Sequence, residues 1–433
     1  MGLLMDDFAH GKNKTALPSP VTQFDWDTKI AELLPDDWKL MDEWASSEAN
    51  MYIVGSHIVS TYAGMPYMDF VKARIWEPLD MSETTFHADE ASQDGKLTQT
   101  WTKFGRRIPI WFPEEQLPLH AGPGGVISNV IDMAKWVAML LNSGTNPVTN
   151  ETILPMSVLT EVTSAHTIVH ARAPSPEFSI SGYGMGWFRE SYQGHELISH
   201  SGGIPGISTE VCFLPSERLG VVILSNADNK HSSELAIIYR IIEDFLGLDR
   251  KASVEYMSTT SSQPLSGKPL PQESMSPRPL TLPLNDYAGT YVSPGYPNIT
   301  LCASSSSTED CEDVINDFKS FDDVSSSPML YARLPNSISI SHVRLRQKHG
   351  DSFALSATNL FPHGYGLDES PFETWDPTSQ EATAEFVVEE ADISNKSPRR
   401  VLGLGLMDLS GELTERRRLN SVEQRSEVWF TKL

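Results

Sequence analysis

Residues 200–206 read His-Ser-Gly-Gly-Ile-Pro-Gly and are flanked by segments typical of short β-strands. Upstream these segments cover 184–188 and 196–199, and downstream the runs 208–213 and 219–224 predict a hairpin. The chain around this stretch is therefore expected to form an antiparallel sheet. Glycines lack a Cβ, so a ligand can approach the backbone closely, and N–H groups there can face an oxyanion. The alternative is a glycine-rich turn that only connects strands.

Two other segments accompany this stretch. Residues 75–86 read Ile-Trp-Glu-Pro-Leu-Asp-Met-Ser-Glu-Thr-Thr-Phe, and residues 121–129 read Ala-Gly-Pro-Gly-Gly-Val-Ile-Ser-Asn before Asp-Met-Ala at 132–134. Together with 198–206 they resemble, in the same order, motifs of the β-lactamase-related serine hydrolases. That family includes class C β-lactamases, penicillin-binding D-alanyl-D-alanine peptidases and related esterases. The resemblance covers about residues 15–246.

The resemblance implies an α+β fold of the β-lactamase/transpeptidase type, with an antiparallel sheet and flanking helices, present here in partial form. Apolar residues at helical spacing predict helices over 51–62, 132–141 and 234–246. Gly64 and Gly247 are well placed to end the first and the last of these.

A change of texture divides the chain. Residues 250–283 are rich in Ser and Pro and predict a linker between a hydrolase-related domain, 1–249, and a second domain, 284–433. The second domain contains short strand-like runs at regular spacing, typical of a small β-barrel or sandwich. The family often carries a lipocalin-like domain at this place. The insert 304–327 is polar and is predicted to be an irregular loop.

Charge and cysteine content limit the partners. A formal net charge of −24 repels phosphate groups, so we expect neither nucleic acid nor a membrane as a partner. The three cysteines contain no Cys-x-x-Cys pair, and His195 to His200 is one residue too long for a His-Glu-x-x-His zinc motif. We therefore expect no metal and no cofactor. Cys302 and Cys311 are either bridged or free.

The nucleophile of the family is missing. Acyl transfer there uses Ser-x-x-Lys on a helix, because side chains at i and i+3 share a face and the amine can take the hydroxyl proton. No lysine of this chain follows a serine at that spacing; the nearest pattern is Thr100-Trp101-Thr102-Lys103. The Tyr-x-Asn motif is absent before Tyr52, where a segment is expected to be lost between Asn50 and Met51. The Tyr-x-Asn at 296–298 lies in the second domain.

The third motif alone keeps its residues. By resemblance, His200, Ser201 and Gly202 occupy its positions, and the N–H of Gly203 is the candidate oxyanion donor. We expect no intact catalytic set, so the sequence leaves open whether the chain is an enzyme.

The beginning of the chain leads to two further expectations. Residues 24–35 resemble a family segment that follows the nucleophile helix, so we expect the chain to begin downstream of that helix. Residues 1–7 have no basic segment followed by an apolar one, so we expect no signal peptide in the chain as written. Its location stays open between secretion of a full-length form and the cytoplasm.

Three hypotheses about function follow. The first is a serine hydrolase lineage acting on amide or ester bonds, with this chain catalytically incomplete. The second is a pseudoenzyme that binds a peptide, ester or glycan in the remnant site. The third is an extracellular structural β module, with the hydrolase-related domain as its scaffold. The expected ligand is a small amide, ester or peptide, and the sequence does not indicate an oligomeric state.

Overall fold

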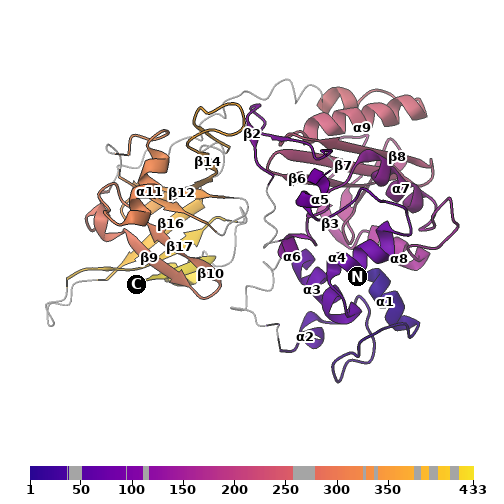
Figure 1. Cartoon of the computed structure of the whole chain (residues 1–433), viewed down its shortest axis with the longest axis horizontal. Helices are drawn as coiled ribbons and strands as arrows, with labels where there is room; N and C mark the ends of the chain where they lie inside the picture. The colour runs from indigo at the N-terminus through magenta and orange to yellow at the C-terminus, as the bar shows by residue number, and fades with distance from the viewer. Residues whose placement is uncertain are drawn as a thin grey trace. The chain divides into compact units, whose positions relative to one another are not determined.

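A computed structural model describes residues 1–36, 38, 51–93, 95–110, 117–256, 278–324, 328–335, 340–374, 382–389, 398–409 and 419–433 (Figure 1). The chain divides into two compact units, Met1–Gln263 and Pro264–Leu433. Each unit has its own hydrophobic core.

The first unit is built on a six-stranded antiparallel sheet whose strand order follows the chain. Its strands are β3 (Thr167–His170), β4 (Ser181–Tyr183), β5 (Phe188–Tyr192), β6 (His195–Ile204), β7 (Ile207–Leu214) and β8 (Leu219–Ser225). Two-residue turns connect β5 to β6 and β6 to β7, and the predicted hairpin of β7 and β8 is confirmed by the pairing of Leu214 with Leu219. β6, which carries the glycine motif, lies between β5 and β7 in this sheet.

One predicted strand is wrong. Residues 184–187 form the turn between β4 and β5, where the Gly184 N–H donates to the Trp187 carbonyl at 2.8 Å. Gly186 has a φ of +97°, a conformation that an extended strand does not contain. The apolar and aromatic content of this run therefore marks a tight turn whose Trp187 packs into the core.

Helices cover both faces of this sheet. On β7, Phe213 belongs to the core that contains Val137 and Leu140 of α7. Cys212 and Leu214 face the other side of the sheet and belong to the core that contains Ile238 of α9. Figure 1 shows α9 on one side of the sheet and α1, α3, α4 and α8 on the other. The α-helices are α1 (Gly2–Ala9), α2 (Ile30–Leu33), α3 (Met51–Ala63), α4 (Tyr67–Val71), α5 (Ala88–Gln93), α6 (Leu117–His120), α7 (Val130–Leu141), α8 (Met156–Thr163) and α9 (His231–Leu246).

The helices of the first unit begin and end where local chemistry directs. The Asn129 side chain accepts hydrogen bonds from the N–H groups of Ile131 and Asp132, which caps α7. Gly64 and Gly247 follow α3 and α9 with φ values of +66° and +67°, as the sequence predicted. A short π-helix, Lys72–Trp76, continues α4.

The first unit continues past its predicted boundary. The Lys251 N–H donates to Glu243 Oε1 at 2.9 Å, and the Ala252 N–H donates to Tyr192 Oη at 3.0 Å. Ala252 and Ser253 are buried. The start of the Ser/Pro-rich segment thus packs on α9, while residues 257–277 lie outside the described chain.

The second unit is an all-β near-barrel. Its eight-stranded antiparallel sheet has the order β10-β9-β18-β17-β16-β13-β12-β11. The backbone groups of Cys302, just after β10, and Tyr331, on β11, exchange hydrogen bonds of 2.7 and 2.9 Å, which links the first strand of that order to the last. The strands are β9 (Gly289–Ser293), β10 (Tyr296–Leu301), β11 (Met329–Arg333), β12 (His342–His349), β13 (Ser352–Thr358), β16 (Ala382–Val388), β17 (Val401–Met407) and β18 (Val428–Lys432).

Side chains fill the core of this second unit. Four buried aromatic residues, Tyr287, Tyr291, Phe353 and Phe386, contact one another among aliphatic side chains. Eight-stranded barrels are either filled by side chains in this way or hold one small ligand. The second unit also contains a two-stranded sheet of β14 (Leu360–Phe361) and β15 (Phe372–Glu373), the one-turn helix Leu284–Asp286 and α12 (Val422–Arg425).

The prediction of an irregular loop over 304–327 is wrong in its middle. Residues Glu309–Phe318 form α11, whose Cys311, Val314, Ile315 and Phe318 are buried against β11 and β14. A disulfide joins Cys302 to Cys311, which resolves the open alternative in favour of a bridge. The helix is thus attached beside the point where β10 meets β11.

Candidate functional site

The site develops around His200 on β6. His200 pairs with Val211 and Gly202 with Thr209 in the register of β6 and β7. A Cβ added to Gly202 would lie 2.2 Å from Thr209 Oγ1, so this position favours glycine. Side chains alternate along a strand, and Ser201, opposite Glu210, therefore points away from the face that His200 occupies.

Two tyrosines join His200 in a hydrogen-bonded chain. Tyr183 Oη, at the end of β4, lies 3.0 Å from His200 Nε2. The hydroxyl of Tyr52, in the first turn of α3, makes a short hydrogen bond with the hydroxyl of Tyr183. Burial raises the pKa of Tyr183, and the hydrogen bond with Tyr52 raises it further. Tyr52 is 46% exposed, so the chain of three side chains, in which Tyr183 and His200 are partly buried, ends at solvent.

Aromatic rings support this chain of hydroxyls. The ring of Phe188 on β5 packs against both Tyr183 and His200, with ring centroids 4.7 Å and 5.7 Å away. The Phe188 ring packs on both side chains, which come from β4 and β6, the two strands on either side of β5.

The backbone of β6 offers donors on the same strand. The two-residue turn Pro205–Gly206 makes Ile204 and Ile207 a hydrogen-bonded pair, and bonded and non-bonded pairs then alternate. By this alternation, the N–H groups of Ser201 and Gly203 point away from β7, towards the side of β5. The pairing of β5 with β6 ends at Phe188 and Ser199, so no strand of this sheet covers the N–H of Gly203 there.

The glycine-rich loop 121–125 lies against α3 at the same place. A Cβ on Gly122 would lie 2.5 Å from the Tyr52 carbonyl oxygen and 2.9 Å from Ser56 Oγ. The loop therefore packs directly on the helical turn that presents Tyr52. Glycine is required at 122 by this contact rather than by an unusual φ angle.

Hydrogen bonds join the two other family-like segments, 75–86 and 121–134, beside this loop. Asp132 Oδ2 accepts from Thr84 Oγ1 at 2.8 Å and from the Glu83 N–H at 2.9 Å. Thr84 in turn lies 2.8 Å from Ser128 Oγ. These contacts fix the glycine-rich loop to the segment 75–86 and leave the Ser128 hydroxyl in a structural role.

The sequence-predicted site residues thus separate. His200 joins the cluster formed with Tyr52 and Tyr183, and Gly202 lies beside it on β6, whereas the Ser201 side chain faces the other way. The two tyrosines were not predicted. Tyr183 directly precedes the mispredicted strand at 184–188, and Tyr52 adjoins the place where the family has its Tyr-x-Asn, so only those neighbourhoods signalled them.

The other sequence patterns take structural places. Thr100 and Thr102 are buried around the short strand β1 (Thr100–Trp101), not on a helix, so they do not reproduce Ser-x-x-Lys. His195 Nδ1 pairs with Glu217 Oε1 at 2.6 Å, apart from the partners of His200. In the chain segments described, no group of three metal-ligating side chains is found. The expected loss of a segment before Met51 concerns residues outside the described chain.

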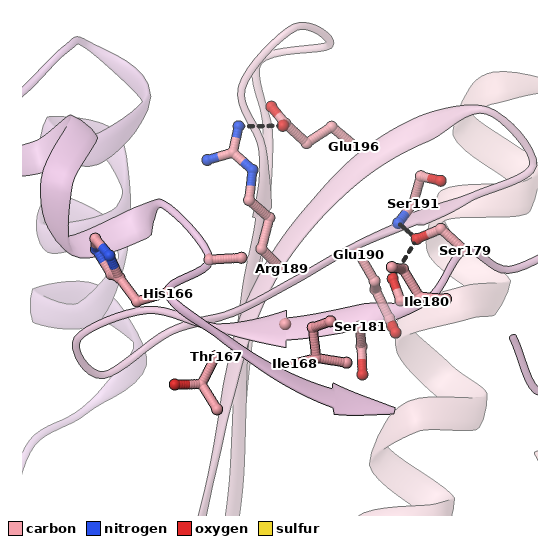
Figure 2. A pocket seen from close by; sticks show the side chains of 12 residues that line it. His166, Thr167, Ile168, Ser179, Ile180, Ser181, Arg189, Glu190, Ser191 and Glu196 are labelled. Carbon is pink, nitrogen blue, oxygen red and sulfur yellow. Dashed lines mark hydrogen bonds and ion pairs between the residues drawn. The ribbon is translucent and has the colours of Figure 1, made fainter. Parts of the chain in front are cut away.

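A separate surface pocket of about 310 Å³ opens at the edge of the sheet near β3. Figure 2 shows the ion pair of Arg189 with Glu196 on one side of it and the Ser179 hydroxyl bonded to the Ser191 N–H on the other. Neither His200 nor its tyrosine partners line this pocket. It is therefore distinct from the cluster on β6.

Comparison with known proteins now gives the lineage. The family model described as Beta-lactamase matches residues 15–244, more than half of the chain. This chain belongs to the β-lactamase family. The match contains α3, β4, β6 and the glycine-rich loop, so the Tyr52–Tyr183–His200 cluster lies within the β-lactamase-family domain.

Two curated relatives carry hydrolase names. The chain is 28% identical over 272 residues to "Unguisins hydrolase ungD'" of Aspergillus campestris, covering 58% of this chain and 48% of that protein. It is 28% identical over 275 residues to "Unguisins hydrolase ungD" of Aspergillus violaceofuscus, with the same coverage. The chain thus spans about half the length of the curated relatives it matches.

Among solved structures, the chain resembles the octameric penicillin-binding protein homologue from Pyrococcus abyssi, with 16% identity and a TM-score of 0.40. The match covers 88% of this chain and 63% of that one. No helix among the described residues is long and apolar enough to cross a membrane.

Proposed function

We propose that the β-lactamase-family domain binds a small amide, ester or peptide at the Tyr52–Tyr183–His200 cluster, and that these 433 residues do not form an acyl-enzyme. The observation that carries the proposal is the hydrogen bond between Tyr183 and His200 on the third-motif strand, beside the half-exposed hydroxyl of Tyr52. A hydroxyl held in this way, with backbone donors nearby, suits a ligand with a carbonyl or carboxylate oxygen.

The backbone of β6 supports the carbonyl part of this proposal. The N–H of Gly203 points to the side of the strand that β5 leaves uncovered, and no Cβ obstructs it. Donors of this kind stabilise an oxyanion when a nucleophile attacks a carbonyl. Without a nucleophile the same donors only bind the ground-state carbonyl, which holds a ligand but does not accelerate its hydrolysis.

Sequence carries the second half of the proposal. No lysine among the 433 residues has a serine three positions before it, so the pair that activates the serine in this family is not present. The hydroxyl of Ser201 faces away from His200 and does not replace it. The second unit has a core filled by its own side chains, so we assign ligand binding to the first unit.

A second candidate is hydrolysis of amide or ester bonds, as in the β-lactamase-related serine hydrolases. The hydrolase names of the two relatives favour it. In that case a nucleophile outside these 433 residues would complete the site.

Covalent labelling separates the two candidates. The purified chain is incubated with a fluorescent penicillin and with a fluorophosphonate probe, and labelled serines are located by mass spectrometry. We expect no stoichiometric label and no nitrocefin turnover above that of a His200→Ala variant. A single serine that is labelled stoichiometrically would establish hydrolysis and refute the binding-only proposal.

Ligand-observed NMR with small amides, esters and acetylated dipeptides then tests binding. The Tyr52→Phe change should weaken binding, because it removes the hydroxyl at the solvent end of the cluster. Tyr296→Phe is the matched control, since Tyr296 is also 46% exposed but lies in the second unit. Equal effects of both changes would contradict the assignment of the site.

A further inference from the structure

We propose that the charge state of His200 sets the polarity of the Tyr52 hydroxyl: protonated His200 makes Tyr52 a hydrogen-bond donor to a ligand oxygen, and neutral His200 makes it an acceptor. This inference rests on the proposed ligand site and specifies which chemistry that site favours at a given pH. It follows from three hydrogen bonds in series.

The first bond fixes one proton. His200 Nδ1 lies 2.6 Å from the carbonyl oxygen of Ser201. A carbonyl only accepts, so Nδ1 carries a proton in both charge states of the ring. The carbonyl of Ser201 is available because the register of β6 turns it away from β7, towards the same side as the N–H of Gly203.

The second bond then depends on charge. In the neutral ring Nε2 has no proton, so Tyr183 must donate its O–H across the 3.0 Å contact. The Tyr183 oxygen is left as an acceptor, and Tyr52 donates to it. The solvent-facing site of Tyr52 is then a lone pair, which suits an N–H or O–H of a ligand.

Protonation reverses the series. The new Nε2–H donates to the Tyr183 oxygen, the Tyr183 O–H turns to the Tyr52 oxygen, and the Tyr52 O–H is released to point at the ligand. One proton is taken from solvent by the imidazole, and each phenol keeps its own proton while its O–H rotates. Burial and the hydrogen bond with Tyr52 raise the pKa of Tyr183, so this phenol keeps its proton in both charge states of His200.

Two phenols are the titratable groups that the hydrogen bonds of the described residues join to His200. The groups that reach it are Tyr183 of β4 and, through that phenol, Tyr52 of α3. The contacts from β5 and β7, Phe188 and Val211, do not titrate. His120, the last residue of α6, precedes the glycine-rich loop, and burial lowers the pKa of its imidazole.

The chemical consequence is a preference for ligand class. At acidic pH the site should favour groups that only accept hydrogen bonds, such as a carboxylate, an ester carbonyl or a tertiary amide. At alkaline pH it should favour groups with an N–H or O–H to donate.

The direct test needs no ligand. The full chain is labelled with ¹⁵N-histidine, and the His200 signals are assigned with a His200→Gln variant. We expect Nδ1 protonated and Nε2 unprotonated at pH 8, and a loss of that Nε2 signature as the ring titrates. A ring with its proton on Nε2 at pH 8 would overturn the inference, whatever the ligand experiments show.

The binding arm uses N,N-dimethylacetamide, a neutral probe that accepts but does not donate hydrogen bonds. Its Kd should fall about threefold to tenfold from pH 8 to pH 5, the factor expected for one gained hydrogen bond. Tyr183→Phe breaks the series and should reduce this ratio to about one. His120→Gln is the control and should keep the full ratio.

The outcomes are separable. If the probe binds equally at both pH values in the unaltered chain, or if Tyr183→Phe keeps the ratio, the inference is wrong although binding itself stands. If the probe does not bind at any pH, the proposed function fails at this site, and the tautomer of His200 still decides whether the hydrogen-bonded series operates.

Discussion

Removing the disulfide should destabilise the second unit by a predictable amount. Cys302 and Cys311 are separated by nine positions and join the end of β10 to α11. In the chain-entropy treatment, closing a loop of this length is worth about 2.7 kcal/mol at 25 °C. We therefore expect Cys302→Ala with Cys311→Ala to lower the free energy of unfolding of Pro264–Leu433 by about 2–3 kcal/mol.

Alanine is the appropriate replacement because both sulfurs are buried, at 1% and 3% residue exposure, so a serine hydroxyl would add a polar group without a partner. For a unit of this size the change corresponds to a fall in Tm of about 5–11 °C. The helix should stay attached in the variant, because Phe318 remains packed on Tyr331 and Asp317 still pairs with Arg333.

The assay is scanning calorimetry of the full chain, with and without a reducing agent. Reductant should shift the transition of the second unit in the unaltered chain and leave the double variant unchanged. Cys212 of the first unit is a free thiol, which a reductant does not change, so the transition of the first unit should not shift. A shift below about 1 °C, or one in the transition of the first unit, would refute the reasoning.

Three further outcomes are expected. Gly202→Ala should cost about 1 kcal/mol in urea unfolding, the low end for overpacking, and Thr209→Ala should restore the loss because the clash is with the Thr209 hydroxyl. Burial raises the pKa of Glu234 in the folded chain. The free energy of unfolding should therefore fall as the pH rises from the unfolded pKa of about 4.3 through the raised folded value, because the buried carboxyl becomes charged. Glu234→Gln should therefore have a higher urea midpoint than the unaltered chain at pH 8 but not at pH 4; equal midpoints at pH 8 would contradict this. Limited proteolysis should first cut between Ser253 and Thr281, both of which hydrogen-bond within their own units, and first cuts inside β6 would contradict a folded first unit.

The strands and the capped helices could be predicted from sequence because local chemistry determines them. The short strand-like runs expected in the second domain include β11, β17 and β18, each a run of mostly apolar residues between turns or polar segments. α7 begins after Asn129 because that side chain satisfies N–H groups of the first turn. In these cases residues within a few positions of each other supply the whole signal.

α11 was missed because its composition conceals its period. Its first turn carries Glu309, Asp310 and Glu312, which suggest a solvated loop. The buried face recurs at Cys311, Val314, Ile315 and Phe318, a spacing typical of an amphipathic helix. The spacing of the apolar residues indicates a helix, but the prediction of a loop followed the acidic composition instead.

The site could be predicted only in part, for a different reason. Tyr52 and Tyr183 are 131 positions apart, and their contact depends on how α3 packs beside the end of β4. No residue near either tyrosine in sequence specifies that packing. The motif on β6 identified His200, but the partners that give this imidazole its direction come from two distant elements.

The residues that reveal the lineage are mostly not those that face a ligand. Thr84, Ser128 and Asp132 lie in the segments that carry the family resemblance, and each hydrogen-bonds within the support beneath the glycine-rich loop. Thr84 and Asp132 are buried and bonded to each other, so a change in either one leaves a buried polar partner unsatisfied. Tyr52 and Tyr183 lie beside the motifs rather than within them. The family signature of this chain therefore resides largely in the scaffold, and the hydroxyls of the proposed ligand site lie outside those motifs.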